Sequence, residues 1–282
     1  MRASARSESL GDPVPESLEE KLRGYLRTYY VVGGMPAAVA EWVEAKNIAS
    51  LEEVQDAILR DYVDDFSKHA ARDLNDLTQI WRSIPRQLSK ENRRFMFGHV
   101  RKGARARDLE NALEWLVSAG LAHKICRLSR PGAPLSAYSD ESMFKLYFSD
   151  VGPLRRLSGV APGFMFDASD RYSHFKGAMA ENHVLNELPV LGKAPYYRRS
   201  DGVAEVDFVA DFGMKAVPIE VKAEEGSKSK SLSRYVSLYG PECAVRASMG
   251  GAGKNGALSV PLWLVWRIGD FVGGDGSFGE AP

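Results

Sequence analysis

The sequence has few cysteines and no long apolar run. Cys126 and Cys243 are the two cysteines among 282 residues, which excludes a disulfide framework and a cysteine-based zinc cluster. No apolar stretch reaches the length of about 18 residues that a membrane-spanning helix needs, and the N-terminus lacks the apolar segment of a secretion signal. These absences predict a cytoplasmic protein in a reducing compartment, with no membrane partner.

An excess of charge of one sign is also missing. Lysine plus arginine number 37, and aspartate plus glutamate number 37, so the whole chain produces no field that would attract a polyanion. Any surface for nucleic acid must therefore be local. The length permits one large or two ordinary domains, and we favour two.

The first half of the chain has the pattern of helices followed by two short strands. Apolar residues recur at helical spacing before residue 90, and a further helix is expected over 108–119, ending at Gly120. Strand-like runs then cover 121–128 and 144–148. Helices followed by a helix and a two-stranded wing are typical of a winged helix, in which 108–119 would be the recognition helix.

A basic cluster precedes that helix. Between Arg86 and Arg107, eight basic residues stand against the single acid Glu91. One interpretation is DNA contact; the other is a packing or protein-contact module with solvated charges. The candidates for DNA contact are Arg101, Lys102, Arg105 and Arg107.

The stretch from Val203 to Lys222 predicts an antiparallel hairpin with charged residues on one face. Side chains alternate along a strand, so Asp207 lies on a polar face of the first strand, and Glu220 and Lys222 share a face of the second. A helix over 172–188 adds Glu181. Carboxylates are the hard ligands of Mg²⁺ or Mn²⁺, and a lysine beside them can orient water or stabilise developing charge. The alternative is an ordinary solvated pair and an exposed helix residue.

The joint order of these residues is similar to that of the PD-(D/E)XK, or restriction-endonuclease-like, nuclease superfamily. Moreover, the chain from about Leu26 to Trp266 resembles the C-terminal region of a prokaryotic family of AAA-type ATPases, known as domain of unknown function 4143. The phrases that carry this resemblance are Gly33–Pro36, Lys102–Leu116, Phe144–Gly152, Lys176–Asn182, Glu205–Val209 and Pro218–Lys222.

Nucleotide binding is not expected from this chain. Gly250–Asn255 looks like part of a phosphate-binding loop, but Ser248 stands where a glycine is needed and Asn255 where serine or threonine is needed. We therefore predict no nucleotide cofactor and no ATPase activity. The expectation is either a stand-alone or truncated relative of that family, or an ATPase module that is a separate product.

The resemblance implies a DNA-binding protein with a nuclease-like domain. Glu181, Asp207 and Glu220 would hold the metal and Lys222 would assist phosphodiester hydrolysis; the alternative is a non-catalytic DNA- or protein-interaction module that partners an ATPase. The expected fold class is mixed α+β and α/β, divided into a disordered tail at 1–14, a helical and winged-helix domain at 15–150, a linker at 151–171, a nuclease-like α/β domain at 172–272 and a flexible tail at 273–282.

Overall fold

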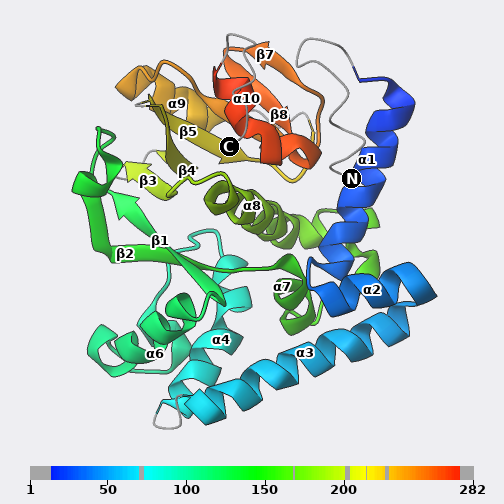
Figure 1. Ribbon diagram of the computed structural model, residues 1–282. Coiled ribbons are helices and arrows are strands. Elements are labelled where there is room, and N and C mark those ends of the chain that lie inside the picture. Colours follow the sequence, from blue (N-terminus) through cyan, green and yellow to red (C-terminus); the bar gives the residue numbers. More distant parts are fainter. Residues whose placement is uncertain are drawn as a thin grey trace. The chain divides into compact units, whose positions relative to one another are not determined.

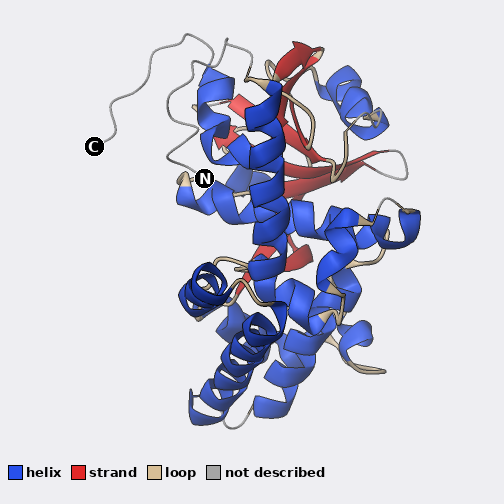
Figure 2. Cartoon of the chain, turned by 90° about the vertical axis from the view of Figure 1, so that its right-hand side faces the viewer, coloured by secondary structure: helices blue, strands red, loops and turns tan. Residues whose placement is uncertain are grey.

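The computed structural model describes residues 14–69, 73–167, 169–200, 204–213, 215–225 and 229–273 (Figure 1). The predicted tails at 1–14 and 273–282 lie outside the described residues, apart from residues 14 and 273. Val203 and Met214 of the predicted hairpin also lie outside them. The described chain mixes helices and strands, as the sequence predicts (Figure 2).

The chain forms two compact units. We call residues 27–125 and 143–182 the helical unit, and residues up to 26, 126–142 and from 183 onward the sheet unit. Within the described ranges, no helix is both long and apolar enough to cross a membrane.

Aromatic packing forms the core of the helical unit. Trp81 is almost fully buried, and its ring meets those of Phe148, Tyr62 and Phe66 at centroid distances of 4.5, 5.6 and 5.9 Å. Edge-on contacts of this kind are favourable for aromatic rings. The helices of this unit are the end of α1 (Glu16–Val32), α2 (Pro36–Ala45), α3 (Ile48–His69), α4 (Leu74–Leu88), α5 (Phe97–Val100), α6 (Ala106–Ser118), α7 (Val151–Leu157), η3 (Pro162–Phe166), η4 (Asp170–Tyr172) and the first turns of α8 (Ser173–Val190).

The predicted helix and strand pair after the basic cluster are present. Helix α6 is followed by β1 (Ala122–Leu128), η2 (Leu135–Tyr138) and β2 (Ser139–Phe148). The backbone N–H of Phe95 donates to the carbonyl of Phe144 at 2.8 Å, and the two rings stack with centroids 5.2 Å apart. The segment before α5 is therefore paired with β2, an arrangement that local sequence patterns did not predict.

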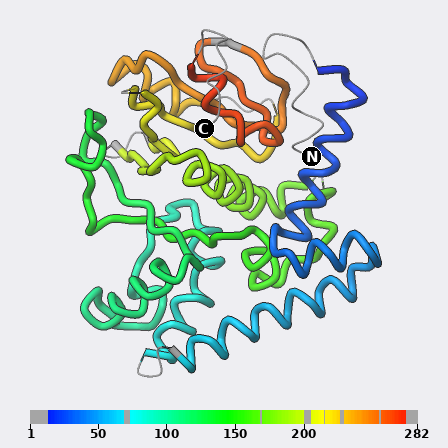
Figure 3. Tube along the Cα trace, in the orientation of Figure 1, coloured from blue at the N-terminus to red at the C-terminus, as the bar shows by residue number. Residues whose placement is uncertain are grey.

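The sheet unit contains the predicted hairpin inside a larger mixed sheet. Strand β4 is antiparallel to both β3 and β5, whereas β5, β6 and β8 run parallel to one another, in the order β3-β4-β5-β6-β8-β7 (Figures 1 and 3). β2 and β1 continue this sheet beyond β3. The elements are β3 (Tyr196–Ser200), β4 (Ala204–Phe212), β5 (Lys215–Val221), α9 (Lys230–Tyr239), β6 (Val245–Ser248), β7 (Gly253–Asn255), β8 (Ala257–Pro261), η5 (Leu262–Arg267) and α10 (Ile268–Gly273).

Strand β4 is buried more completely than the predicted alternation suggests. Val206, Phe208, Val209 and Ala210 are all fully buried, so apolar residues point to both faces of the strand. A strand in the interior of a sheet that is covered on both sides needs such a continuous apolar run. Only Asp207 and its neighbours toward the start of β4 keep the predicted polar alternation.

The segment predicted as a linker, 151–171, is instead a packed part of the helical unit. It contains α7, in which Arg155 is fully buried. The Arg155 guanidinium donates to the carbonyl of Val31 at 3.0 Å, to Glu52 Oε1 at 2.9 Å and to Gln55 Oε1 at 2.6 Å. Pro153 falls in the first turn of α7 and Pro162 opens η3, positions where the missing N–H costs no helical hydrogen bond, so neither proline requires a linker.

Asp150 holds the connection between α1 and α2 against α7. Its two carboxylate oxygens accept hydrogen bonds from the backbone N–H of Gly34 at 2.6 Å and of Gly152 at 2.7 Å. Burial raises the pKa of Asp150, although these two N–H groups act in the opposite direction. Gly33 has a φ of 79°, and a Cβ there would lie 2.4 Å from Asp150 Oδ1. Only glycine fits this approach.

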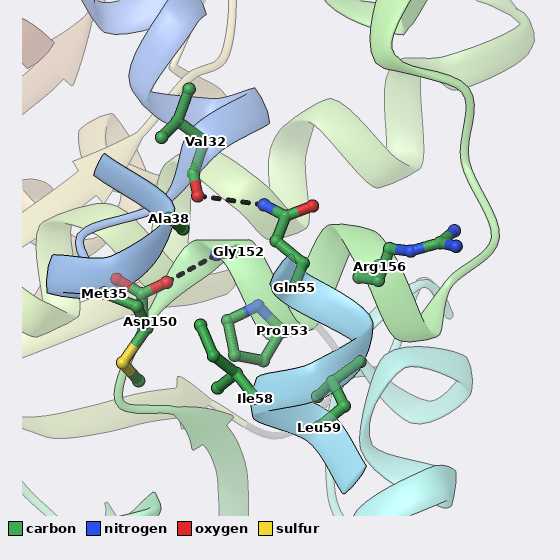
Figure 4. Close-up of a pocket in the computed structure, with 10 residues that line it drawn as sticks. All are labelled: Val32, Met35, Ala38, Gln55, Ile58, Leu59, Asp150, Gly152, Pro153 and Arg156. Carbon is green, nitrogen blue, oxygen red and sulfur yellow. Dashed lines mark hydrogen bonds between the residues drawn. The ribbon is translucent and has the colours of Figure 1, made fainter. Parts of the chain in front are cut away.

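A small cavity lies beside this carboxylate (Figure 4). Its volume is about 10 Å³, and Met35, Gln55 and Pro153 are among the residues that line it. That is the space of about one water molecule. The cavity is therefore a packing defect next to Asp150 and has no room for a small-molecule substrate.

We expect Gly33→Ala to lower the free energy of unfolding by about 1–3 kcal/mol, because the added methyl group overpacks the site against Asp150 and Gly152. Gly24→Ala is the matched control. Gly24 lies within α1 with nothing within 4 Å of the added Cβ, so this change should raise stability by about 0.5–1 kcal/mol through helix propensity. Urea unfolding measures both variants. A neutral Gly33→Ala would show that the approach to Asp150 is not tight.

Candidate functional site

Two of the predicted carboxylates and the predicted lysine come together on β4 and β5. Phe208 faces Ile219 in the antiparallel register, which places Asp207 beside Glu220 on adjacent strands. Asp207 Oδ2 accepts the backbone N–H of Val221 at 2.8 Å. Lys222 Nζ lies 2.7 Å from Glu220 Oε1. The Glu-X-Lys spacing on one strand face thus produces the contact that the sequence predicts.

Glu220 also caps helix α9. The side chain is only 2% exposed, and its Oε2 accepts the backbone N–H of Leu232 at 3.0 Å and the hydroxyl of Ser229. Leu232 is in the first turn of α9, where backbone N–H groups have no partner within the helix. A carboxylate at this end is favoured by the helix dipole. Glu220 therefore ties strand β5 to the helix that follows it.

Opposing effects set the acidity of Glu220. Burial raises its pKa above the ordinary value, and the nearby Asp207 carboxylate raises it further. Lys222 and the N–H of Leu232 act in the opposite direction, because both stabilise the charged form. Burial is the largest of these effects.

Glu181 is part of the helical unit and has partners there. It is 2% exposed, forms an ion pair with Arg93, and accepts the hydroxyl of Tyr147 at 3.0 Å. Gly177, one turn earlier on α8, makes room for this pairing, because a Cβ there would lie 2.8 Å from Arg93 Nη2. The sequence predicted an exposed residue or a metal ligand; the structure gives Glu181 a buried ion pair.

Asn182 strengthens the same attachment of α8 to β2. Its side-chain oxygen accepts the N–H of Phe148 at 3.0 Å, and its side-chain nitrogen donates to the carbonyl of Phe148 at 2.7 Å. The Asn182 side chain thereby makes two hydrogen bonds with the backbone of Phe148, as a neighbouring strand would. The phrase Lys176–Asn182, which carries part of the resemblance to domain 4143, thus includes side chains that attach helix α8 to strand β2.

The described residues contain no cluster of three or more histidine, cysteine, aspartate or glutamate side chains placed to hold a metal ion. Asp207 and Glu220 remain a pair of hard oxygen donors. Sequence patterns did not predict the partners of the candidate carboxylates, which are Ser229 for Glu220 and Arg93 and Tyr147 for Glu181. Only Ser229 had a local signal, since a serine directly before a helix is a common capping residue.

The basic cluster is less basic in three dimensions than in sequence. Arg101 forms an ion pair with Asp76, while Lys102, Arg105 and Arg107 are exposed at the start of α6. The outer face of α6 also carries acids, because Asp108, Glu110 and Glu114 are all exposed there. Lys124 lies 2.7 Å from Glu114, and Arg107 lies 3.7 Å from Asp108. Acids therefore share this helix face with the candidate DNA-binding residues.

Family models match two parts of the chain. Residues 23–163 match the family described as Domain of unknown function (DUF8612), and residues 176–262 match the family described as Domain of unknown function (DUF4143). The sequence-based resemblance to domain 4143 is therefore confirmed for the second part, whereas the first part matches a different family. Neither the comparison with curated proteins nor that with solved structures gave a match.

Titration of Glu220 provides a test of its burial. The folded protein raises its pKa above the ordinary value of 4.5, so the folded state binds this proton more tightly than the unfolded chain. The stability contributed by Glu220 is thus complete below pH 4.5 and is lost as the pH rises through the folded pKa. Glu220→Gln does not titrate. The excess stability of wild type over Glu220→Gln should therefore fall as the pH rises above 4.5 and then become constant.

Urea unfolding at half-unit steps from pH 4 to pH 9 measures this difference. Lys222→Met is the matched variant, because removing the lysine removes an effect that lowers the Glu220 pKa. The fall should then extend to higher pH. If the excess stability of wild type instead grew with pH, the folded pKa would be lowered and the carboxylate would be better stabilised than burial suggests.

Proposed function

The chain belongs to the family described as Domain of unknown function (DUF8612), and from this premise we propose that it is a DNA-binding, nuclease-like protein that hydrolyses phosphodiester bonds with a divalent cation. The observation that carries the proposal is the meeting of Asp207, Glu220 and Lys222 on two paired strands. Two hard oxygen donors and one ammonium group on a single face suit a metal and a phosphate.

The order of elements around this face supports the same proposal. Helix α8 precedes β3, the β4–β5 pair carries the three residues, and α9 leads into the parallel strand β6. This is the order of the PD-(D/E)XK nuclease-like superfamily that the sequence resembles. Residues 176–262, which match domain 4143, include all of these elements except the first turn of α8. The helices and β1–β2 pair before them keep the helix-and-wing order of a winged helix.

Asp207 and Glu220 fit a divalent cation by the chemistry of their donors. Mg²⁺ or Mn²⁺ commonly binds through one or two carboxylates, with water in the remaining positions. When bound, the cation lowers the pKa of an attacking water and neutralises charge on the phosphate. The proposal leaves out Glu181, which belongs to the helical unit and pairs there with Arg93 and Tyr147.

The other residues of the site act on these donors. Ser229 and the N–H of Leu232 hold Glu220 Oε2 in place, which leaves Oε1 toward Lys222. The N–H of Val221 fixes Asp207 in the same way. The Lys222 side chain lies 2.7 Å from Glu220 Oε1 and can donate a hydrogen bond to a phosphate oxygen.

A specific observation favours a second candidate function, a non-catalytic module that binds DNA or another protein such as an ATPase. Glu181 and Glu220 both have structural partners, so each carboxylate is explained without a metal. The acids on the outer face of α6 also fit protein contact better than a DNA groove.

A cleavage assay separates the two. With Mg²⁺ or Mn²⁺ the purified protein should cut duplex or branched DNA, and Asp207→Asn or Lys222→Met should lower the rate by about 10²-fold or more, since each removes a group that acts on the reacting phosphate. Glu181→Gln is the matched carboxylate control and should retain cutting, because Glu181 serves packing in the helical unit.

Urea unfolding of every variant shows which losses come from unfolding. Equal cutting by wild type and Asp207→Asn would identify a contaminating nuclease. Absence of cutting by a folded wild type on all substrates would reject hydrolysis in favour of the non-catalytic module. Loss of cutting in a folded Glu181→Gln variant would restore Glu181 to the metal site.

A further inference from the structure

Helix α9 has an outer face of unusual composition. Its ten residues include no acid. Leu232 and Tyr235 are buried, and they pack in the apolar cluster that contains Val206 and Val209 of β4. The exposed residues at spacings of three and four, which form a single helix face, are Lys230, Ser233, Arg234 and Ser237.

An aromatic and basic contact lies at the end of the same helix. Arg198 of β3 donates to the hydroxyl of Tyr239 at 3.1 Å, and its guanidinium lies 5.8 Å from the centre of the Tyr239 ring. Tyr239 is 37% exposed and Leu238 is 46% exposed. The helix thus presents two cations and two hydroxyls along its length, and an accessible ring beside a third cation at its end.

This face begins at the candidate site. The first turn of α9 holds Glu220 through the N–H of Leu232, and Lys230 is the first residue of that turn. Two exposed acids, Glu224 and Glu225, precede the helix, and Glu225 lies 3.9 Å from Arg23. The outer face of α9 and the candidate site thus meet at the first turn of the helix.

We propose that the outer face of α9 binds the backbone of a nucleic-acid strand, with Lys230 and Arg234 on phosphates and the Tyr239 ring against a base. Ammonium, guanidinium and hydroxyl groups are the usual phosphate partners, and aromatic rings are the usual platforms for unpaired bases. The inference rests on the proposed function only in making the bound strand the substrate of the site. It moves the DNA contact from α6, where the sequence suggested it, to α9.

Binding can be measured without hydrolysis. Fluorescence anisotropy with a labelled single-stranded 20-mer and the same sequence as a duplex, in EDTA, follows the full-length protein as salt is varied. Lys230→Glu/Arg234→Glu should weaken binding by about tenfold or more. If the two residues contact two phosphates, replacing both by glutamine should reduce the slope of log affinity against log salt by about 1.4–1.8. Tyr239→Ala should weaken binding of the single strand more than binding of the duplex.

Lys102→Glu/Arg105→Glu on α6 is the matched charge reversal. It should change affinity less than twofold, because acids already share that helix face. An α9 variant that binds like wild type would overturn the inference, as would an α6 variant with the larger loss. Displacement of DNA by polyglutamate as readily as by polyphosphate would also overturn it, since the partner would then be an acidic protein. Binding that depends on α9 in a protein that does not cut would uphold the inference while rejecting hydrolysis.

Discussion

A charged side chain that leaves water must find a partner, and this constraint organises both units. Uncompensated burial of a charge costs several kcal/mol. In the sheet unit, Glu220 meets Lys222 and the first turn of α9, which joins β5 to the helix after it. In the helical unit, Arg155 joins α7 to α3 and to the end of α1, and Glu181 joins α8 to Arg93 and β2. Glu220, Arg155 and Glu181 thus each link different elements of their own unit.

The same constraint gives Glu181 and Glu220 different surroundings, although both are buried. Glu181 pairs with the Arg93 guanidinium, accepts a hydrogen bond from the Tyr147 hydroxyl and is almost inaccessible to solvent. Both interactions therefore stabilise the packing of the helical unit. Glu220 divides its two oxygens, one toward α9 and one toward Lys222. This division leaves a lysine and a neighbouring aspartate on the side away from the helix. One carboxylate thus joins two elements through one oxygen and pairs with a neighbouring cation through the other.

Sequence patterns predicted what depends on neighbours along the chain. The hairpin and the Glu220–Lys222 contact follow from the alternation of side chains along paired strands. Partners distant in sequence were not predicted. No residue near Glu181 in the sequence predicts that it pairs with Arg93. The glycines and proline around Arg155 suggested a linker, where the structure has a packed helix. Local composition describes chain flexibility, whereas burial depends on what folds against the segment.

The basic cluster shows that charge counted along the sequence does not give the charge of the folded surface. A polyanion responds to charges within a screening length of about 8–10 Å, and a helix rises only about 1.5 Å per residue. On α6, Arg107 lies 3.7 Å from Asp108 and three residues from Glu110, and all three are exposed, so the fields of opposite charges offset one another. On α9, Lys230 and Arg234 are one turn apart with no acid in the helix, so their fields add. Two cations on an acid-free helix face can thus attract nucleic acid more strongly than a longer basic sequence whose folded surface is mixed.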